Sequence, residues 1–463
     1  MPKSGQYPAM LIPSAREASR DRSIVTPGVA ATAAAAARPR LARGVLRRLP
    51  PGVRRPAFDV EALRPGILHL GCGAFHRAHQ AVFTQRALEA EGPGDAPAPW
   101  GIVSASLCRA ATRDALRPQE GLYAVLERGP GGTRAEVVGS LCEVLFAPDD
   151  PSALLARFRD PGIRIVTLTV TGPAYCLDPG TGRLCPDHPD IRRDLGARWP
   201  RSAVGVLARG LAEARRAGRR PPVVLSCDNL AANGRTLRQA VVDYAALSDD
   251  RLAAWIAGTV QFPSCMVDRI VPTASGADRE DAASILGFAD EATVAAEPFR
   301  QWVIEQFDGP RPLWEAAGAQ FVGDVSPWEA SKLRLLNGTH LAIACLGLLA
   351  GLRTVGEFVA EPAGSAYALR MMLDEQAPTL PPGSGHDIPA YARQLLERWR
   401  NPGIAHELAR VGRNGSEKLP TRLLATLRDN LAAGRPAPCT ILAVAAWILC
   451  AAGRGTAPGG TPQ

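Results

Sequence analysis

Short apolar strands alternate with helical stretches in the first half of the sequence, and this alternation restricts the fold more than any other feature. Four segments have the length and character of buried strands: ILHL (67–70), WGIVSASL (100–107), IRIVTLTV (163–170) and PVVLSCDN (222–229). Stretches with helical spacing separate them, as in residues 78–92. Strands that alternate with helices form parallel sheets covered on both faces. The sequence therefore predicts an α/β fold that begins with a Rossmann-like, doubly wound parallel sheet.

Helical patterns replace the strand patterns in the second half of the chain. Examples are RTLRQAVVDYA, RLAAWIAGTV, EPFRQWVIEQF and IPAYARQLLERW. We expect a Rossmann-like dinucleotide-binding domain over residues 58–258 and a mostly α-helical substrate and catalytic domain over residues 259–452. A flexible tail is expected over residues 453–463, which are rich in glycine.

The net charge of +8 comes from the N-terminal extension. Residues 1–57 hold 11 Lys and Arg against two acids, so the remaining 406 residues sum to −1. The extension includes ATAAAAARPR and has no clear periodicity, so we expect it to be disordered. Because the charge belongs to a tail without interleaved aromatic residues, it does not predict nucleic-acid binding. No apolar run reaches the length of a membrane span.

The ten cysteines are scattered and include no C-x-x-C pair. This pattern argues against a structural zinc site and against a disulfide framework. Free cysteines are typical of a reducing compartment, so we expect a cytoplasmic protein without a bound metal.

The first predicted strand ends in a glycine-rich turn, LGCGAFHRAHQ (70–80). Gly71 and Gly73 stand between strand and helix, where glycines let the backbone approach a pyrophosphate. His76 occupies the place of the third glycine of the usual fingerprint, so the turn alone indicates dinucleotide binding only weakly. Arg109, instead of an acid, follows the next strand. An arginine there could bind a 2′-phosphate, which leaves NAD and NADP both open.

The segment KLRLLNGTH (332–340) places three polar side chains among leucines. At about 100° per residue, Lys332, Asn337 and His340 share one arc of a helix with apolar side chains. A buried lysine amine is costly unless it is paired or loses its proton, and a lysine with a lowered pKa is a general base. An asparagine amide can donate to a developing alkoxide, and a histidine can orient a substrate. Asn-Gly is also a turn signal, so a helix that begins or kinks there is the alternative interpretation.

Lysine is rare in this chain, which has three lysines (Lys3, Lys332 and Lys418) against 50 arginines. Arginine keeps its proton in proteins, whereas a desolvated lysine can lose it. A lysine retained in the middle of an arginine-rich chain is therefore a candidate for acid–base chemistry.

These motifs resemble the polyol-specific long-chain dehydrogenases, the family of mannitol dehydrogenase and fructuronate reductase. KLRLLNGTH is similar to the K-x-x-x-x-N-x-x-H signature of that family, and the resemblance extends from about residue 45 to residue 452. The other segments that follow the family pattern, in the same order, are GCGAFHRAHQAVF, LSCDNLAANG, FPSCMVDRIVP, EPFRQWVIEQF, GTHLAIACLGLLAGLRTV and RNGSEKLPTRLL.

The resemblance implies a zinc-independent hydride transfer between NAD and a linear polyol. It places the general base on Lys332, the oxyanion-binding amides on Asn337 and Asn229, and the substrate-orienting histidine on His340. The further contacts that it implies are Asp268, Arg410 and Lys418 for the substrate, and Gly71, Gly73, Ala74 and Phe75 for the cofactor.

The sequence departs from the family pattern in several places. The stretch around EQFDGPRP is shorter than usual, and the first 44 residues have no counterpart in the family. The segment Thr171-Gly172-Pro173-Ala174-Tyr175 differs from the usual one on the nicotinamide side, and the sequence ends soon after AVAAWILC. We favour interconversion of D-mannitol and D-fructose. The alternatives are a fructuronate reductase, which oxidises D-mannonate, and a catalytically impaired dinucleotide-binding relative. We expect NAD as cofactor with NADP as the alternative, and a monomer or weak oligomer that binds a small polyol or sugar acid and neither nucleic acid nor membrane.

Overall fold

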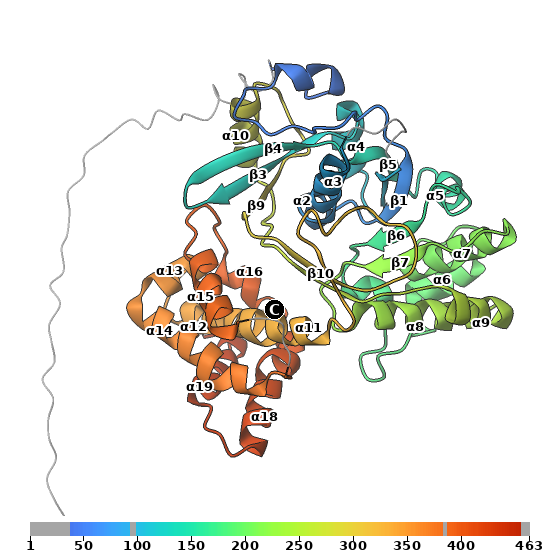
Figure 1. Cartoon of the computed structure of the whole chain (residues 1–463). Helices are drawn as coiled ribbons and strands as arrows, with labels where there is room; N and C mark the ends of the chain where they lie inside the picture. Colours follow the sequence, from blue (N-terminus) through green and yellow to red (C-terminus); the bar gives the residue numbers. More distant parts are fainter. Residues whose placement is uncertain (1–37, 93–98, 383–386, 455–463) are drawn as a thin grey trace, which may run out of the picture.

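The structure is a computed structural model that describes residues 38–92, 99–382 and 387–454. In Figure 1 the strands, coloured blue to yellow, gather in one part of the molecule, and the orange and red helices form the other. Of the helices in these ranges, none combines the length and the apolar character that crossing a bilayer requires.

Five parallel strands form the main sheet, in the order β5-β2-β1-β6-β7. The strands are β1 (Pro65–Leu70), β2 (Gly101–Ser106), β5 (Leu141–Phe146), β6 (Ile165–Leu168) and β7 (Val223–Ser226). The strand order reverses between β1 and β6. This is the arrangement of a Rossmann-like sheet, in which ligands bind beyond the carboxyl ends of the strands at the point of reversal. The predicted fold class is confirmed.

Side chains of the main sheet alternate between two apolar clusters, one on each face. On β1, Ile67 packs in the cluster that contains α3 (Gln80–Glu91), whereas Leu68 and Leu70 pack in the cluster that contains α7 (Ala203–Arg216). Burial on both faces explains why these strands read as continuous apolar runs. The other helices of this part are α2 (Ala74–Ala78), α4 (Ala111–Leu116), α5 (Pro151–Arg157), α6 (Pro189–Gly196), α8 (Asn233–Ala246), α9 (Asp250–Thr259) and α10 (Gly276–Leu286).

Two three-stranded sheets flank the main one. In the first, β3 (Tyr123–Gly129) pairs with β4 (Gly132–Val138) in a hairpin and with β9 (Val294–Ala296) in parallel. In the second, β10 (Gln301–Glu305) lies between β8 (Cys265–Asp268) and β11 (Gln320–Val322).

Two predictions for this region were wrong. The boundary expected near residue 258 lies too early, because β8 and β10 pack Val267 and Ile304 into the same cluster as β1. The stretch EPFRQWVIEQF was expected to be helical, yet it contains β10. Trp302 and Ile304 pack in one cluster and Val303 in another, so both faces of this strand are buried. A short apolar run that is buried on both faces cannot be told from a helix by its periodicity.

The part of the chain from Ser326 onward is helical, as predicted. Its elements are α11 (Ser326–Ser331), the π-helical segment η4 (Lys332–Gly338), α12 (Thr339–Leu349), α13 (Val355–Ala360), α14 (Pro362–Arg370), the π-helical segment η5 (Met371–Gln376), the 3-10 helix η6 (Ala377–Thr379), α15 (Ile388–Trp399), α16 (Leu408–Gly412), α17 (Gly415–Leu419), the π-helical segment η7 (Pro420–Leu424), α18 (Ala425–Ala432) and α19 (Pro438–Ala451).

The N-terminal extension that we expected to be disordered is partly folded. Residues 1–37 lie outside the described residues, but Arg43–Arg48 form a 3-10 helix, and Leu41 and Leu49 are buried. These leucines pack in a cluster with side chains of β3, β4 and α10. The prediction of disorder was wrong for residues 38–57, because a charge count over the whole extension hides its few apolar side chains.

Leu41→Ala tests whether this segment belongs to the folded protein. Because Leu41 is fully buried in that cluster, we expect the free energy of unfolding to fall by about 2–5 kcal/mol. Urea unfolding followed by tryptophan fluorescence measures it, with the exposed Arg47→Ala as the control that should change little. An unchanged midpoint for Leu41→Ala would contradict the packing described here.

Candidate active site

A cavity of about 1000 Å³ lies at the carboxyl ends of β1, β6, β7 and β8, where the strands meet the helical part. This volume is at the upper end of the usual range for ligand pockets, about 300–1,000 Å³. Residues that follow the strands form one wall, and η4 together with the segment 403–422 forms the other. The cavity therefore lies at the crevice that the strand order predicts.

The glycine-rich turn reaches this cavity directly after β1. Gly73, Ala74 and Phe75 line the wall, whereas Gly71 lies behind it and shapes the turn. Gly71 has φ +101°, and a Cβ atom there would come within 2.2 Å of the Thr169 carbonyl oxygen, so only glycine fits. At Gly73 a Cβ atom would meet only the Gly71 oxygen, at 3.9 Å, so this backbone is open to a ligand. The turn thus provides the close backbone approach that a pyrophosphate needs.

Lys332 enters the cavity wall from the helical part and is 7% exposed. Its amine donates to Oδ1 of Asn229 (2.8 Å) and to the Val267 carbonyl oxygen (2.6 Å). Asn229 follows β7 and Val267 belongs to β8, so the lysine joins the helical part to two strand ends. Burial lowers the pKa of the Lys332 amine, and the nearby Asp268 carboxylate opposes this shift only in part.

The segment that carries Lys332 is π-helical, which the sequence analysis did not anticipate. Hydrogen bonds in a π-helix join residues five apart, so Lys332 and Asn337 lie on one face. An α-helix would separate them by about 140°. The helix neither begins nor ends at Asn-Gly but continues into α12. Gly338 allows close packing, because a Cβ atom there would lie 2.7 Å from the Arg422 carbonyl oxygen and 2.8 Å from Nε2 of Gln376.

Asn337 and His340 present polar groups that the protein leaves available to a ligand. Both line the cavity and are 8% and 5% exposed. Among the described residues the Asn337 amide has no hydrogen-bond partner, and neither does the buried Nε2 of His340. Burial and the neighbouring His406 hold the pKa of His340 well below its usual value, so the imidazole is neutral. A buried polar atom without a partner is costly, so a hydrogen bond from a ligand hydroxyl to Nε2 of His340 would be favourable.

Asp268 also lines the cavity, at the end of β8, where it is 5% exposed. Burial opposes its ionisation, but the charges of Arg398 and Lys332 outweigh that effect and lower the pKa of the Asp268 carboxyl. Its Oδ2 accepts a hydrogen bond from Nη1 of Arg398 (2.7 Å). Asp268 is therefore a buried, paired anion close to the lysine.

Basic side chains gather on the wall opposite the strands. Lys418 and Arg410 lie there as the sequence analysis expected, together with Arg413 and Arg422. None of these four forms an ion pair with another described residue. The Lys418 amine donates instead to the carbonyl oxygens of Val411 (3.2 Å) and Arg413. Arg413 and Arg422 were not singled out before, because nothing in the sequence distinguishes them among 50 arginines.

The loop after β6 is anchored by a residue that sequence reasoning missed. The Asp228 carboxylate accepts hydrogen bonds from the backbone N–H groups of Val170 (2.9 Å) and Thr171 (2.7 Å) and from the hydroxyl of Tyr175 (2.9 Å). Asp228 thereby fixes the segment where the sequence departs from the family pattern, and Thr171 lines the cavity. The sequence feature that could have identified Asp228 is its position directly before Asn229.

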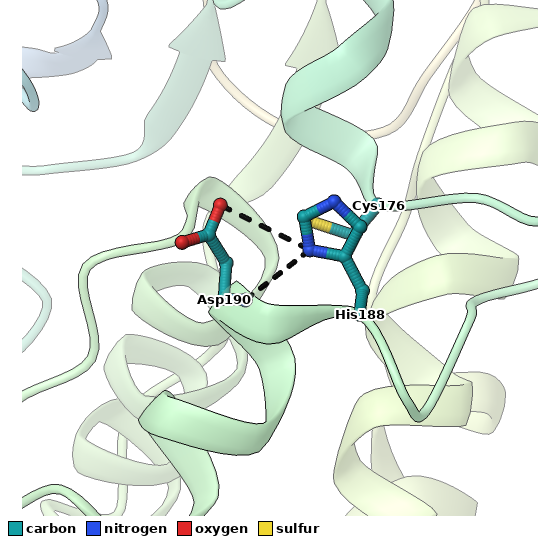
Figure 2. A group of neighbouring side chains, drawn as sticks. All are labelled: Cys176, His188 and Asp190. Atoms are coloured by element: carbon teal, nitrogen blue, oxygen red, sulfur yellow. Dashed lines mark hydrogen bonds and ion pairs between the residues drawn. The ribbon is translucent and has the colours of Figure 1, made fainter.

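A second group of potential metal ligands, Cys176, His188 and Asp190, does not line this cavity. Figure 2 shows these three side chains close together. The ligand atoms of Cys176, His188 and Asp190 lie within 4.8 Å of one another. However, Nδ1 of His188 accepts the backbone N–H of Asp190 (3.2 Å) and caps α6. The Asp190 carboxylate pairs with Nη1 of Arg193 (2.7 Å). Because the ring nitrogen and the carboxylate are both engaged, we interpret this group as a helix cap.

Comparison with known proteins gives a consistent result over most of the chain. Residues 65–316 match the family described as the mannitol dehydrogenase Rossmann domain, and residues 324–457 match the mannitol dehydrogenase C-terminal domain. D-mannonate oxidoreductase of Escherichia coli is 42% identical over 402 residues, which cover 86% of this chain and 82% of that protein. Mannitol 2-dehydrogenase of Aspergillus terreus is 40% identical over 396 residues, 84% and 78% of the two chains.

Solved structures agree with these sequence relatives. The ternary complex of Pseudomonas fluorescens mannitol 2-dehydrogenase with NAD and D-mannitol superposes with a TM-score of 0.83 at 38% identity, and the match covers 92% of this chain and 86% of that chain. A substrate-free D-sorbitol dehydrogenase superposes with a TM-score of 0.81 at 32% identity, over 88% and 84%.

Gly338→Ala tests the close packing of η4 against η7. The added methyl group meets backbone at 2.7 Å, so we expect the unfolding free energy to fall by about 1–3 kcal/mol. The matched control is Gly258→Ala in α9, where a Cβ atom meets nothing within 4 Å. That change should be neutral or stabilise by up to about 1 kcal/mol. Thermal unfolding of both variants measures the difference, and equal effects would contradict the packing.

Proposed function

The chain belongs to the mannitol dehydrogenase family, and on that premise we propose that it is an NAD-dependent oxidoreductase that interconverts D-mannitol and D-fructose. The observation that supports this most is the buried Lys332 amine, which lies beside two polar groups without partners, the Asn337 amide and Nε2 of His340. A base and hydrogen-bond donors in one cavity are what oxidation of a secondary alcohol requires.

The hydrogen bonds of Lys332 fit the role of general base. A neutral amine has two N–H groups and one lone pair, and here it donates to two oxygens, those of Asn229 and Val267. The lone pair is thus left to accept the proton of the substrate hydroxyl. After the transfer the ammonium group has a third N–H, which can donate to the ketone oxygen of the product. A lowered pKa favours the neutral form that begins this cycle.

Asn229 and Asn337 are the candidate donors to the substrate oxygen. Because Oδ1 of Asn229 accepts from the lysine, its Nδ2 group is oriented and remains free to donate. The Asn337 amide lines the same cavity. Donors placed in advance stabilise the charge that develops on the oxygen as its proton leaves. The neutral His340 imidazole can hold a neighbouring substrate hydroxyl, and Asp268 faces the same space.

The turn after β1 fits a dinucleotide, with Gly73, Ala74 and Phe75 as the contacting residues. NAD would accept the hydride when bound there. We favour NAD because the Pseudomonas fluorescens relative is a complex with NAD. Arg109 is exposed after β2, and it is the position at which NADP would find a partner for its 2′-phosphate.

Oxidation of a sugar acid, such as D-mannonate, is the second candidate. It is favoured by the unpaired basic side chains Arg410, Arg413, Lys418 and Arg422 on the cavity wall. Burial lowers the pKa values of Lys418 and Arg422, and neither cation forms an ion pair with a carboxylate of the described residues. A substrate carboxylate would compensate them. For either reaction we propose a cytoplasmic protein that is a monomer or weak oligomer. The ten cysteines are all free thiols, which fits a reducing compartment.

Replacing Lys332 tests the proposed base. Lys332→Ala should lower kcat for D-mannitol oxidation by about 10²–10⁴-fold, while NADH binding, measured by fluorescence, remains. Lys332→Arg keeps the positive charge but cannot release a proton, so it should be equally inactive. In the wild type, oxidation should rise with pH as Lys332 loses its proton, and ketose reduction should fall. NADH binding without turnover of any polyol or sugar acid in the wild type would favour the catalytically impaired relative.

Arg410→Gln distinguishes the two candidate substrates. If a sugar acid is the substrate, removing this unpaired cation should lower kcat/KM for D-mannonate by about 10-fold or more, and the value for D-mannitol should change less. The control is Arg353→Gln, because Arg353 is exposed and does not line the cavity. Steady-state kinetics with both compounds measures the ratio. A larger loss with D-mannitol would remove the argument for the sugar acid.

A further inference from the structure

Arg398, at the end of α15, occupies an unusual position for a charged residue. It is 8% exposed. Its guanidinium donates twice to the Glu297 carboxylate (3.0 and 2.7 Å) and once to Asp268 (2.7 Å). The group also lies over the Phe299 ring, 3.9 Å from its centroid. All of these partners come from the strand-rich part of the chain, so the side chain ties α15 to that part.

The contact between Arg398 and Asp268 lies next to a hydrogen bond of the proposed base. Asp268 is the last residue of β8, and the residue before it, Val267, supplies the carbonyl oxygen to which the Lys332 amine donates at 2.6 Å. Glu297 is itself fixed, because its carboxylate accepts the backbone N–H of Ile270 (2.7 Å). Arg398 therefore lies between the carboxylates of Glu297 and Asp268, and through Asp268 it holds the end of β8, one residue away from the lysine's partner.

Charge is the second link between Arg398 and the lysine. The titratable groups that act on the Lys332 amine are Asp268 and Cys265 from β8, His79 from the start of α3, Arg398 from α15 and Arg422 from η7. Burial lowers the pKa of His79 to about 3, so that imidazole is neutral. Asp268 is thus the anion that favours the protonated lysine, and the two arginines oppose it.

We propose that Arg398 is a positioning residue for Lys332, which fixes the Val267 carbonyl through Asp268 and balances the Asp268 charge so that the lysine can act as a base. The inference rests on the proposed function of Lys332. Without Arg398, the Asp268 anion would face the lysine with only Arg422 to oppose it. The ammonium form would then be favoured more strongly, so the proton acceptor would form only at a higher pH than in the wild type.

The rarity of lysine makes a direct test feasible. The protein contains three lysines, so labelling with ¹³C at the lysine Cε gives three NMR signals, and Lys332→Ala identifies the relevant one. In Arg398→Gln, the Lys332 signal should titrate at higher pH than in the wild type. The control is Arg86→Gln, which removes a comparably buried ion pair with Glu136 (2.6 Å) away from the cavity. It should leave the Lys332 titration unchanged.

The pH dependence of kcat/KM is a second measurement. It would not change if Arg398 only stabilised the fold. The pH profile of kcat/KM for alcohol oxidation should move to higher pH in Arg398→Gln, and kcat/KM at neutral pH should fall by about 10-fold for each pH unit by which the profile moves. Arg398→Lys keeps the charge and should return the profile close to that of the wild type. An unmoved profile with a uniformly lower kcat/KM would show that Arg398 acts on stability alone and would overturn the inference.

Arg398→Gln leaves two buried carboxylates and could fail to fold. The double variant Arg398→Gln/Glu297→Gln removes one charge of each sign. In this variant too, the Lys332 signal should titrate at higher pH than in the wild type. An unmoved Lys332 titration in either folded variant overturns the inference, whatever the activity. If the titration moves but the wild type oxidises no substrate, the coupling stands and the proposed function fails.

Discussion

The site depends on the burial of a single amine at the place where the two parts of the chain meet. An isolated lysine charge in such a position costs several kcal/mol. The protein offsets this cost with two hydrogen bonds, from the Lys332 amine to Asn229 and to Val267. Both acceptors lie at strand ends, so the lysine is held only when the sheet and the helical part are packed together. The proposed base is therefore part of the interface between the two parts of the chain.

The π-helical segment is what makes this arrangement compatible with a donor beside the base. It brings Asn337 onto the face of Lys332, five residues earlier. π-helical turns are rare within α-helices, so this one needs support from its surroundings. Gly338 supplies part of that support by allowing the backbone of Arg422 to pack closely. Two further π-helical segments, η5 and η7, lie in the same helical part.

Electrostatics then divides the cavity into two regions. Near the lysine, charges are paired, as with Asp268 and Arg398. Along the opposite wall, Arg410 and Arg422 carry charges that no described residue pairs. In the proposed function, the paired charges act on the pKa of Lys332, and the unpaired cations face the space that a substrate would occupy. Arg398 and Arg410 lie on different helices, α15 and α16, whereas Arg422 on the unpaired wall also lowers the pKa of Lys332.

The periodicity of the sequence was enough to predict the main sheet, the helical second part and the segment with Lys332, Asn337 and His340. These features are local, because a buried strand and a polar residue among leucines are visible within a few positions. The pairing of β9 with β3 and the role of Asp228 depend on contacts between distant segments, so no local pattern indicated them. The hairpin of β3 and β4 is local, but the sequence analysis did not identify it. The resemblance to a family supplied Asn229, Asp268, Arg410 and Lys418, which no periodicity singles out.

The sequence by itself determined that the chain has a Rossmann-like sheet and a lysine among leucines, because strand length, helix spacing and residue type are properties of neighbouring positions. Only the tertiary structure decided the partners of that lysine. Asn229 and Val267 lie 103 and 65 residues away, and Arg398 meets Asp268 across 130 residues. Hydrogen bonds and ion pairs form through space, and the packing of helices against strand ends sets which groups come within reach.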